Sequence, residues 1–239
     1  MSSAKIRLYV DHPLSHGQSV PLSREQAHYL FGVMRLGLGA PVALFNGRDG
    51  EWQAKVVEAG KRGGTLECDA QSAPLVLPPD VWLLFAPIKK ARTDFIVEKG
   101  VEMGVRRIVP VQTEYTNAGR IQRDRLQAHA VEAAEQCGAT LVPEVAALEK
   151  LDRVLATLDD RHVMFCDEAR AGDTPALRGA PGPWAVLVGP EGGFSERERT
   201  RLRGLQNACP VALGPRILRA DTAAVAALTV WQMALGDWQ

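Results

Sequence analysis

Two turns near the C-terminus hold the residues of this chain that are best suited to bind a small ligand. Residues 189–195, Gly-Pro-Glu-Gly-Gly-Phe-Ser, follow a short apolar strand predicted at 185–188. The three glycines allow backbone conformations and close approaches that other residues exclude. The turn lacks the lysine of a phosphate-binding P-loop, and it carries Glu191, whose charge repels anions. It therefore favours a neutral or cationic ligand, with a plain strand-to-helix connection as the equal alternative.

The second turn, residues 214–223, strengthens the case for a site. Arg216 and Arg219 flank an apolar pair, and Asp221 is the predicted N-cap of the following helix. Two arginines beside two apolar residues are poorly suited to a core, whereas the apolar pair is suited to hold a flat ring. The alternative is that the arginines are only solvated and the pair fills the core. We favour a site because we expect the two turns to follow neighbouring strands.

The elements that must position these turns belong to an α/β domain. From residue 81 onward, apolar strands alternate with longer helical segments, which is typical of a largely parallel sheet. We expect strands at 81–86, 107–111, 162–166, 185–188 and 211–213, and helices at 93–103, 123–138, 148–158 and 222–235. A loop rich in proline and glycine is predicted at 173–182. The last helix is apolar on several faces, which favours burial against a second subunit.

Residues 1–72 predict a separate, mostly β module. Strands are expected at 6–10, 42–45, 52–58 and 65–70, with a hairpin turn at 46–50. A capping box, Ser23 to Gln26, opens a helix that is expected to end near Arg35. Short strands separated by turns favour a small barrel. The three prolines between residues 72 and 79 predict a linker.

The densest basic cluster of the chain follows the strand at 81–86. It contains Lys89, Lys90 and Arg92. Cations at this place are suited to grip an RNA backbone; the alternative is a solvated helix entry.

Composition excludes several classes of protein. Lys and Arg together number 28, as do Asp and Glu, so binding to nucleic acid must rest on local patches. No apolar run reaches the length of a membrane span, and the N-terminus has no signal-peptide pattern. The four cysteines are far apart, which favours reduced thiols in a cytosolic protein and no metal site. None of the five histidines lies in either turn.

The two turns together resemble the signatures of the RsmE family. The matching runs are residues 188–195 and 213–223, and a weaker match, Lys89 to Gly104, departs at Thr93 and Met103. Gln136-Cys137-Gly138 also matches, whereas Tyr115 and Ala139 depart from the family pattern. The resemblance implies a SPOUT-class methyltransferase that transfers a methyl group from S-adenosylmethionine to N(3) of a uridine in 16S ribosomal RNA. It also implies a knotted (trefoil) α/β domain at 80–239, an RNA-binding PUA-like β-barrel at 1–72, a homodimer and a cytoplasmic location.

The resemblance and the chemistry of the reaction assign roles to particular residues. Arg219 is the first candidate to stabilise the anionic ring of the acceptor, ahead of Arg216 and Lys89. Glu191 is a candidate base, or it orders its loop only, so the base stays unassigned. The expected RNA contacts are Arg7, Arg35, Lys89, Lys90, Arg92 and Arg216. The expected cofactor contacts are Leu187, Val188, Gly189, Pro190, Glu191, Gly193, Leu213, Gly214, Ile217, Leu218, Thr222 and Ala223.

Two other functions stay open at this stage. One is a SPOUT methyltransferase with another target, such as a ribose 2′-hydroxyl of transfer or ribosomal RNA. The other is a non-catalytic RNA-binding protein that keeps the fold.

Overall fold

The structure is a computed structural model that describes residues 4–167, 177, 179 and 182–238. The chain divides into two compact units, Met1–Leu77 with Ala134–Val142, and Pro78–Ala133 with Pro143–Gln239. The predicted loop at 173–182 lies largely outside the described residues. Within the described part of the chain, no helix has the length and apolar character needed to cross a bilayer.

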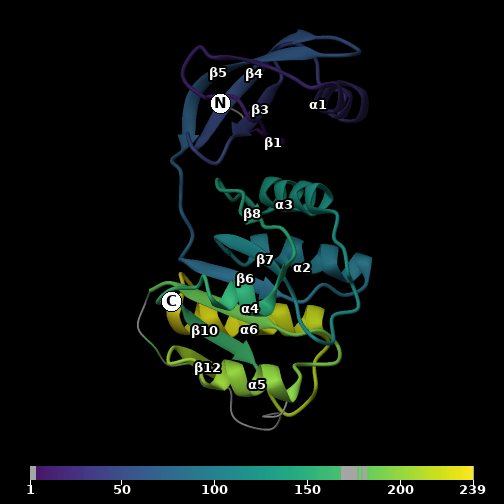
Figure 1. The fold of residues 1–239 in the computed structure, drawn as a ribbon. Coiled ribbons are helices and arrows are strands. Elements are labelled where there is room, and N and C mark those ends of the chain that lie inside the picture. Colours follow the sequence, from purple (N-terminus) through teal and green to yellow (C-terminus); the bar gives the residue numbers. More distant parts are fainter. Residues whose placement is uncertain (1–3, 168–176, 178, 180–181, 239) are drawn as a thin grey trace. The chain divides into compact units, whose positions relative to one another are not determined.

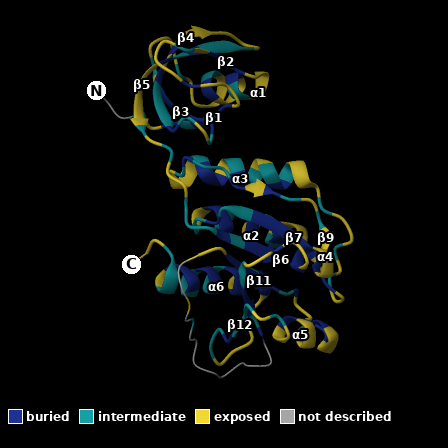
Figure 2. Ribbon diagram, turned by 60° about the vertical axis from the view of Figure 1, so that its left-hand side comes forward, coloured by how far each residue is buried: buried dark blue, intermediate teal, exposed yellow. Residues whose placement is uncertain are grey.

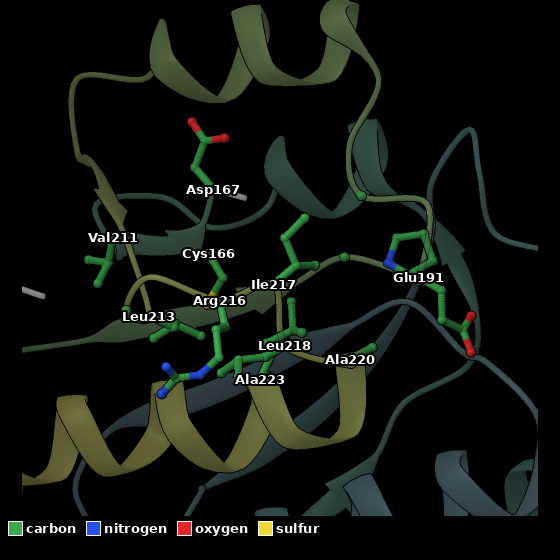
Figure 3. Close-up of a pocket in the computed structure, with 15 residues that line it drawn as sticks. Cys166, Asp167, Glu191, Val211, Leu213, Arg216, Ile217, Leu218, Ala220 and Ala223 are labelled. Carbon is green, nitrogen blue, oxygen red and sulfur yellow. The ribbon is translucent and has the colours of Figure 1, made fainter. Parts of the chain in front are cut away.

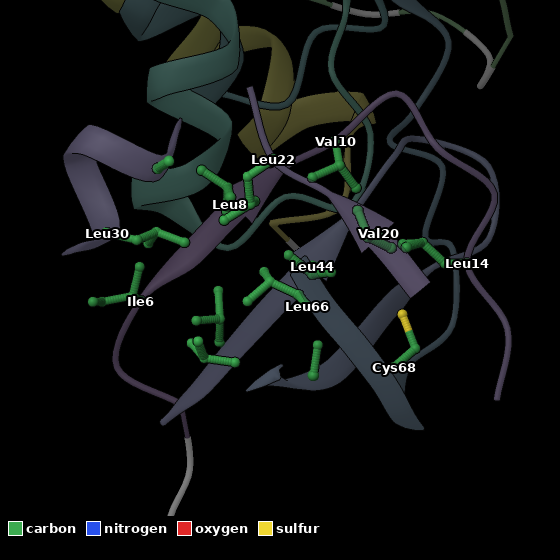
Figure 4. Packing of buried hydrophobic residues seen from close by; sticks show 14 residues of the cluster. Ile6, Leu8, Val10, Leu14, Val20, Leu22, Leu30, Leu44, Leu66 and Cys68 are labelled. Atoms are coloured by element: carbon green, nitrogen blue, oxygen red, sulfur yellow. The ribbon is translucent and has the colours of Figure 1, made fainter. Parts of the chain in front are cut away.

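The first unit is built on a five-stranded sheet in the order β1-β3-β4-β5-β2. Its strands are β1 (Arg7–Tyr9), β2 (Ser19–Pro21), β3 (Pro41–Phe45), β4 (Glu51–Ala59) and β5 (Gly64–Ala73). Helix α1 (Arg24–Ala27) opens with the predicted capping box at Ser23 and continues as a π-helical segment, η1 (His28–Val33). Buried apolar side chains from the sheet and from α1 and η1 form one core, as Figure 4 shows.

The predicted hairpin at 46–50 joins β3 to β4, with Phe45 opposite Glu51. Its conformation is held by side chains, because the Asn46 oxygen accepts the backbone N–H groups of Arg48 and Asp49. The Asp49 carboxylate accepts the N–H of Leu14, and this bond lowers the pKa of the carboxyl group. The hairpin therefore anchors the N-terminal segment to the sheet.

The second unit contains a sheet in the order β12-β10-β11-β6-β7-β8, with β9 paired to β7 (Figure 1). Every recorded pairing in it is parallel, as the alternation of strands and helices predicts. The strands are β6 (Val81–Phe85), β7 (Arg107–Gln112), β8 (Glu144–Val145), β9 (Glu149–Lys150), β10 (His162–Cys166), β11 (Trp184–Val188) and β12 (Ala208–Val211). The prediction placed the last strand at 211–213, about three residues too late.

The helices of this unit are α2 (Lys90–Glu102), α4 (Leu151–Leu155), α5 (Glu196–Arg203), α6 (Ala220–Leu235) and α3 (Arg123–Cys137) up to residue 133. Helix α6 contacts α2 and β11, and buries Leu228 and Trp231. A separate core cluster joins β6, β7, β10 and β11 to α4 and α5. The central strands are buried on both faces in Figure 2, which matches their continuous apolar sequences.

Candidate functional site: a pocket at the ends of β10, β11 and β12

A pocket lies where three parallel strands of the second unit end (Figure 3). Both predicted turns line it. Its walls are formed by Cys166, Asp167, Val188, Gly189, Pro190, Glu191, Gly193, Val211, Leu213, Gly214, Arg216, Ile217, Leu218, Ala220 and Ala223. The carboxyl edge of a parallel sheet is where α/β folds place ligands. The structure therefore brings the two turns to one site.

The strand order corrects one step of the sequence argument. We expected the strands before the two turns to be neighbours, but β10 lies between β11 and β12. The turns therefore face each other across the end of β10. Two residues that the sequence prediction missed, Cys166 and Asp167, line the pocket for this reason.

Asp167 is fixed by contacts on both sides of the strand end. Its backbone N–H donates to the carbonyl of Val211 at 3.2 Å, which ties the end of β10 to that of β12. Its carboxylate, only 2% exposed as a residue, accepts hydrogen bonds from the Arg203 guanidinium of α5. The sequence did contain a signal, because Asp167 is a carboxylate directly after a predicted buried strand.

The glycines of the first turn are required for different reasons. Gly193 has a φ of +68°, a left-handed conformation that side chains disfavour. Gly192 has no such φ, but a Cβ there would lie 3.2 Å from the Cβ of Tyr115. At Gly189 a Cβ would lie 3.2 Å from the Phe194 ring, which is itself buried. The turn therefore owes its path both to backbone conformation and to close packing.

A buried carboxylate holds the first turn against the loop after β7. Glu198 is 7% exposed; its Oε2 accepts the N–H of Ser195 at 2.9 Å, and its Oε1 accepts that of Glu114 at 2.8 Å. The Ser195 hydroxyl in turn accepts the N–H of Glu198, which completes the predicted capping box of α5. One side chain thus caps the helix and joins the Thr113–Thr116 loop to the pocket turn.

The second turn presents exposed side chains beside an apolar wall. Ile217 is 79% exposed, whereas Leu213 and Leu218 are half-buried. The N-cap of α6 is Arg219, and not Asp221 as predicted; no side chain caps this helix. Asp221 lies in the first turn of α6, where its carboxylate is 3.7 Å from the Arg92 guanidinium.

Most of the predicted cofactor contacts line the pocket, but two do not. Leu187 is fully buried in the core of the sheet, because alternate residues of β11 point to opposite faces. Thr222 is exposed and lies outside the pocket lining. Among the catalytic candidates, Glu191 lines the pocket, but its carboxylate points away from the other labelled side chains in Figure 3. Arg219 is exposed, between the pocket-lining residues Leu218 and Ala220.

The candidate RNA contacts differ in how freely their charged groups can reach a ligand. Arg7 is already engaged within the chain, because its guanidinium is bonded to Glu51 at 2.7 Å and to the carbonyls of Ala134, Glu135 and Ala139. It also lies 4.5 Å above the Phe45 ring. These bonds give Arg7 a structural role within the first unit.

The other basic residues are less constrained. Arg35 is exposed at a left-handed φ of +55°, directly after the cap of η1. Lys89 and Lys90 are exposed at the start of α2, while Arg92 is half-buried beside Asp221. Arg216 lines the pocket.

Comparisons with known proteins agree with this architecture. Residues 76–232 match the RNA methyltransferase domain family, and residues 22–67 match the RNA methyltransferase PUA domain family. The ribosomal RNA small subunit methyltransferase E of Rickettsia conorii is 27% identical to this chain, over 93% of each protein.

Two solved structures share the whole fold. One is a ribosomal RNA small subunit methyltransferase E from Neisseria gonorrhoeae bound to S-adenosylmethionine; it is 28% identical, with a TM-score of 0.89 over 98% of this chain and 99% of that one. The other is a methyltransferase from Legionella pneumophila in complex with the same cofactor; it is 28% identical, with a TM-score of 0.91 over 98% of this chain and 100% of that one. The pocket, the fold and these matches all agree. The chain therefore belongs to the RNA methyltransferase family, in the group named ribosomal RNA small subunit methyltransferase E.

Proposed function

We propose that this protein methylates N(3) of a uridine in 16S ribosomal RNA, with S-adenosylmethionine as the methyl donor. The observation that carries the proposal is the convergence of both family signatures, residues 188–195 and 213–223, on one pocket. The relatives supply the substrate class, since they are named as methyltransferases of small-subunit ribosomal RNA.

The pocket residues are suited to this donor. Val188, Leu213, Leu218 and Ala223 offer apolar surface for a purine ring, and the glycines bring backbone close to a ligand. Among the residues that the structure describes, no lysine lines the pocket, as is appropriate for a donor that has a sulfonium and no phosphate. When bound, S-adenosylmethionine supplies an electrophilic methyl group. The predicted contacts that line the pocket are the residues that we propose to hold it.

The acceptor nitrogen must lose a proton before or during the transfer. We assign Arg219 to stabilise the negative charge that develops on the uracil ring. Its exposed position at the start of α6, beside two pocket-lining residues, supports this role. Glu191 is the carboxylate on the pocket turn that we propose as the base. The remaining contribution is positioning, because a direct displacement requires the nucleophile, methyl and leaving sulfur to be aligned.

The two units take different parts in this proposal. We assign donor binding and catalysis to residues 80–239, and RNA binding to a PUA-like domain at 1–72. In the first unit β1 and β2 lie at opposite edges of the sheet yet share one core, which supports its closure as a small barrel. In the second, the likeness of residues 188–195 and 213–223 to the family signatures supports a trefoil knot.

Assembly and location complete the proposal. We propose a homodimer that uses the C-terminal part of the chain, where Met233 and Trp238 are exposed apolar side chains. The molecular mass from light scattering tests this directly. We propose that the substrate is ribosomal RNA within the small subunit and that the reaction takes place in the cytoplasm.

The decisive experiment incubates the protein with labelled S-adenosylmethionine and small ribosomal subunits that lack the modification. We expect label in 16S ribosomal RNA and, by mass spectrometry of the digested RNA, a 3-methyluridine. Methylation of a ribose hydroxyl would replace the target that we propose. If the protein neither binds the donor nor incorporates label, the remaining hypothesis is a non-catalytic RNA-binding protein.

A further inference from the structure

A second cavity opens at the same edge of the parallel sheet, after β6 and β7. Residues from the start of α2, from the segment before α3 and from the first turn of α3 line it. We call this cavity the basic pocket; it is formed by Pro87, Ile88, Lys90, Thr93, Ala118, Arg120, Ile121, Gln122, Arg125 and Leu126. All of these residues belong to the second unit of the chain. The basic pocket is distinct from the donor pocket, with which it shares no residue.

The charges around the basic pocket are one-sided. Three cations line it, Lys90, Arg120 and Arg125, and no carboxylate is among its lining residues. Arg125 is held in place by Asp94, whose Oδ2 accepts a bond from Nη1 at 2.5 Å. Lys90 and Arg120 are exposed and form no ion pair within the described residues. Two of the three positive charges are therefore free to meet an anion.

The nearby polar residues do not neutralise these cations. His129 lies between Glu98, 3.1 Å from Nδ1, and Asp94, 3.7 Å from Nε2. Both carboxylates are thus directed to the α3 side chains and not to Lys90 or Arg120. The Nε atom of Arg125 is buried without a hydrogen-bond partner in the described structure.

The start of α2 adds to the positive potential in the cavity. Its N-cap is Lys89, no side chain caps the helix, and no acidic residue lies in its first turn. A helix N-terminus has a partial positive charge, so a lysine placed there gains nothing from the helix dipole. The Thr93 hydroxyl group is already bonded to Ile88, so the cations are the side chains of the pocket that can bind an anion.

The basic pocket lies beside the donor pocket along the sheet edge. Strands β11 and β6 are neighbours, and the N–H of Ala86 donates to the carbonyl of Val188 at 3.0 Å where they end. The loop after β7 carries Tyr115, which contacts the pocket turn at Gly192. The order of the strands therefore places a cationic cavity next to the site where the methyl group is transferred.

We propose that the basic pocket binds a backbone phosphate of the RNA strand that is being methylated. This rests on the proposed function, because it takes RNA as the substrate. A phosphodiester is opposite in charge to the two free cations, and contacts to phosphate position an RNA strand without reading its sequence. The apolar residues Ile88, Ile121 and Leu126 provide a floor on which the adjoining sugar or base can lie.

The test measures how the affinity for RNA depends on salt. The probe is transcribed 16S ribosomal RNA, and the variants are Arg120→Gln and Lys90→Gln with Arg120→Gln. Removing one cation that binds a phosphate reduces the slope of log K against log salt concentration by about 0.7 to 0.9. Because the pocket is proposed to bind one phosphate, we expect the slope to fall by about one such step in the double variant and by a smaller amount in the single variant, with unchanged affinity for S-adenosylmethionine.

A matched control separates the pocket from general charge. Arg153→Gln removes an arginine of the same unit whose side chain is 77% exposed and lies in α4. We expect it to leave the slope at the wild-type value. Because Lys90 and Arg120 are exposed, neither substitution should lower the thermal midpoint of unfolding.

The outcomes distinguish this proposal from the proposed function. If the wild-type protein methylates RNA and the double variant has an unchanged salt slope, the phosphate-binding role of the basic pocket is wrong and the proposed function stands. If the wild-type protein transfers no methyl group, the proposed function is wrong. The salt dependence of RNA affinity still tests whether the basic pocket binds phosphate. If inorganic phosphate at constant ionic strength stabilises the wild type but not the double variant, and the RNA slope is unchanged, the pocket binds free anions and the RNA assignment is wrong.

Discussion

Helices α5 and α2 begin after neighbouring strands, β11 and β6, yet the N-terminus of α5 is capped by side chains and that of α2 is not. Helix α5 has a complete capping box, in which Ser195 and Glu198 satisfy its first N–H groups, and Glu196 adds a second acid to the first turn. Helix α2 has Lys89 at its N-cap, no side-chain cap and no acid in its first turn. Helix α6, the third at this edge, has Arg219 at its N-cap and no side-chain cap, but Asp221 lies in its first turn.

This difference shows how one sheet edge can serve two kinds of ligand. Where a carboxylate of the chain itself closes a helix N-terminus, the positive end of the helix dipole is already neutralised. The turn before α5 then suits a donor without phosphate. Where the N-terminus stays open among cations and has no acid in its first turn, as in α2, an anionic partner is favoured. We therefore propose that the turns before α5 and α6 hold the donor and that the open N-terminus of α2 meets the RNA.

The largest effect is expected at the turn before α5. Gly193→Val forces a β-branched side chain into a φ of +68°, where such residues are strongly disfavoured. We expect binding of S-adenosylmethionine, measured by calorimetry, to be lost while circular dichroism stays that of a folded protein. Gly63→Val is the control, since that glycine has open space and no positive φ. Retained affinity in the Gly193 variant would remove this turn from the donor site.

The next effect concerns the uncapped end of α6. Arg219→Ala removes an exposed guanidinium and no packing, so the thermal midpoint should not change. We expect turnover to fall by about 10² to 10³, as for loss of one group that stabilises a developing anion. Donor affinity should stay at the wild-type value. A turnover near wild type in labelled-donor assays would exclude the catalytic role of Arg219.

A third experiment weakens the cap of α5 itself. Glu198→Gln keeps one carbonyl oxygen where the carboxylate accepts two backbone N–H groups, from Ser195 and Glu114. One buried donor is left without a partner, which costs about 1 to 3 kcal/mol of the free energy of unfolding. Urea denaturation measures this loss. We also expect weaker donor binding, because the same carboxylate joins the pocket turn to the Thr113–Thr116 loop; equal donor affinity would limit Glu198 to stability.

The smallest effect comes from giving α2 the cap that α5 has. Lys89 has extended N-cap dihedrals, φ −57° and ψ 141°, which a serine can adopt. Lys89→Ser should be more stable than Lys89→Ala by about 0.5 to 2 kcal/mol, the usual value of a side-chain cap. Both variants lose the same charge, so any further loss of RNA affinity in the serine variant reports closure of the helix N-terminus. Equal RNA affinities would show that only the lysine charge matters.

Local patterns in the sequence predicted much of this molecule correctly. The capping boxes at Ser23 and Ser195 and the hairpin at 46–50 depend on residues only a few positions apart, and the structure confirms all three. Segment ends were less accurate: β12 begins three residues before its predicted start, and α2 begins at Lys90 instead of Thr93. The hydroxyl of Thr93 bonds back to Ile88, so Thr93 lies inside the first turn of α2 and not at its start.

Long-range contacts could not be predicted from local patterns. Arg7 looks like a surface cation in a short strand, but Glu51 and carbonyls more than a hundred positions away surround its guanidinium. Tyr115 looks like an isolated departure from the family pattern, yet it lies against Gly192. No local pattern contains these partners.

The sequence by itself determined the two glycine turns, their caps, the strand–helix alternation and the family, because each depends on residue types at short spacing. Only the tertiary structure decided that β10 lies between β11 and β12, that Cys166 and Asp167 therefore join the pocket, and that the cations near α2 and α3 line a second cavity. The physical reason is that strand order is set by which apolar faces pack together across the whole sheet. The strand order therefore depends on all the strands at once, and it cannot be predicted from any single segment.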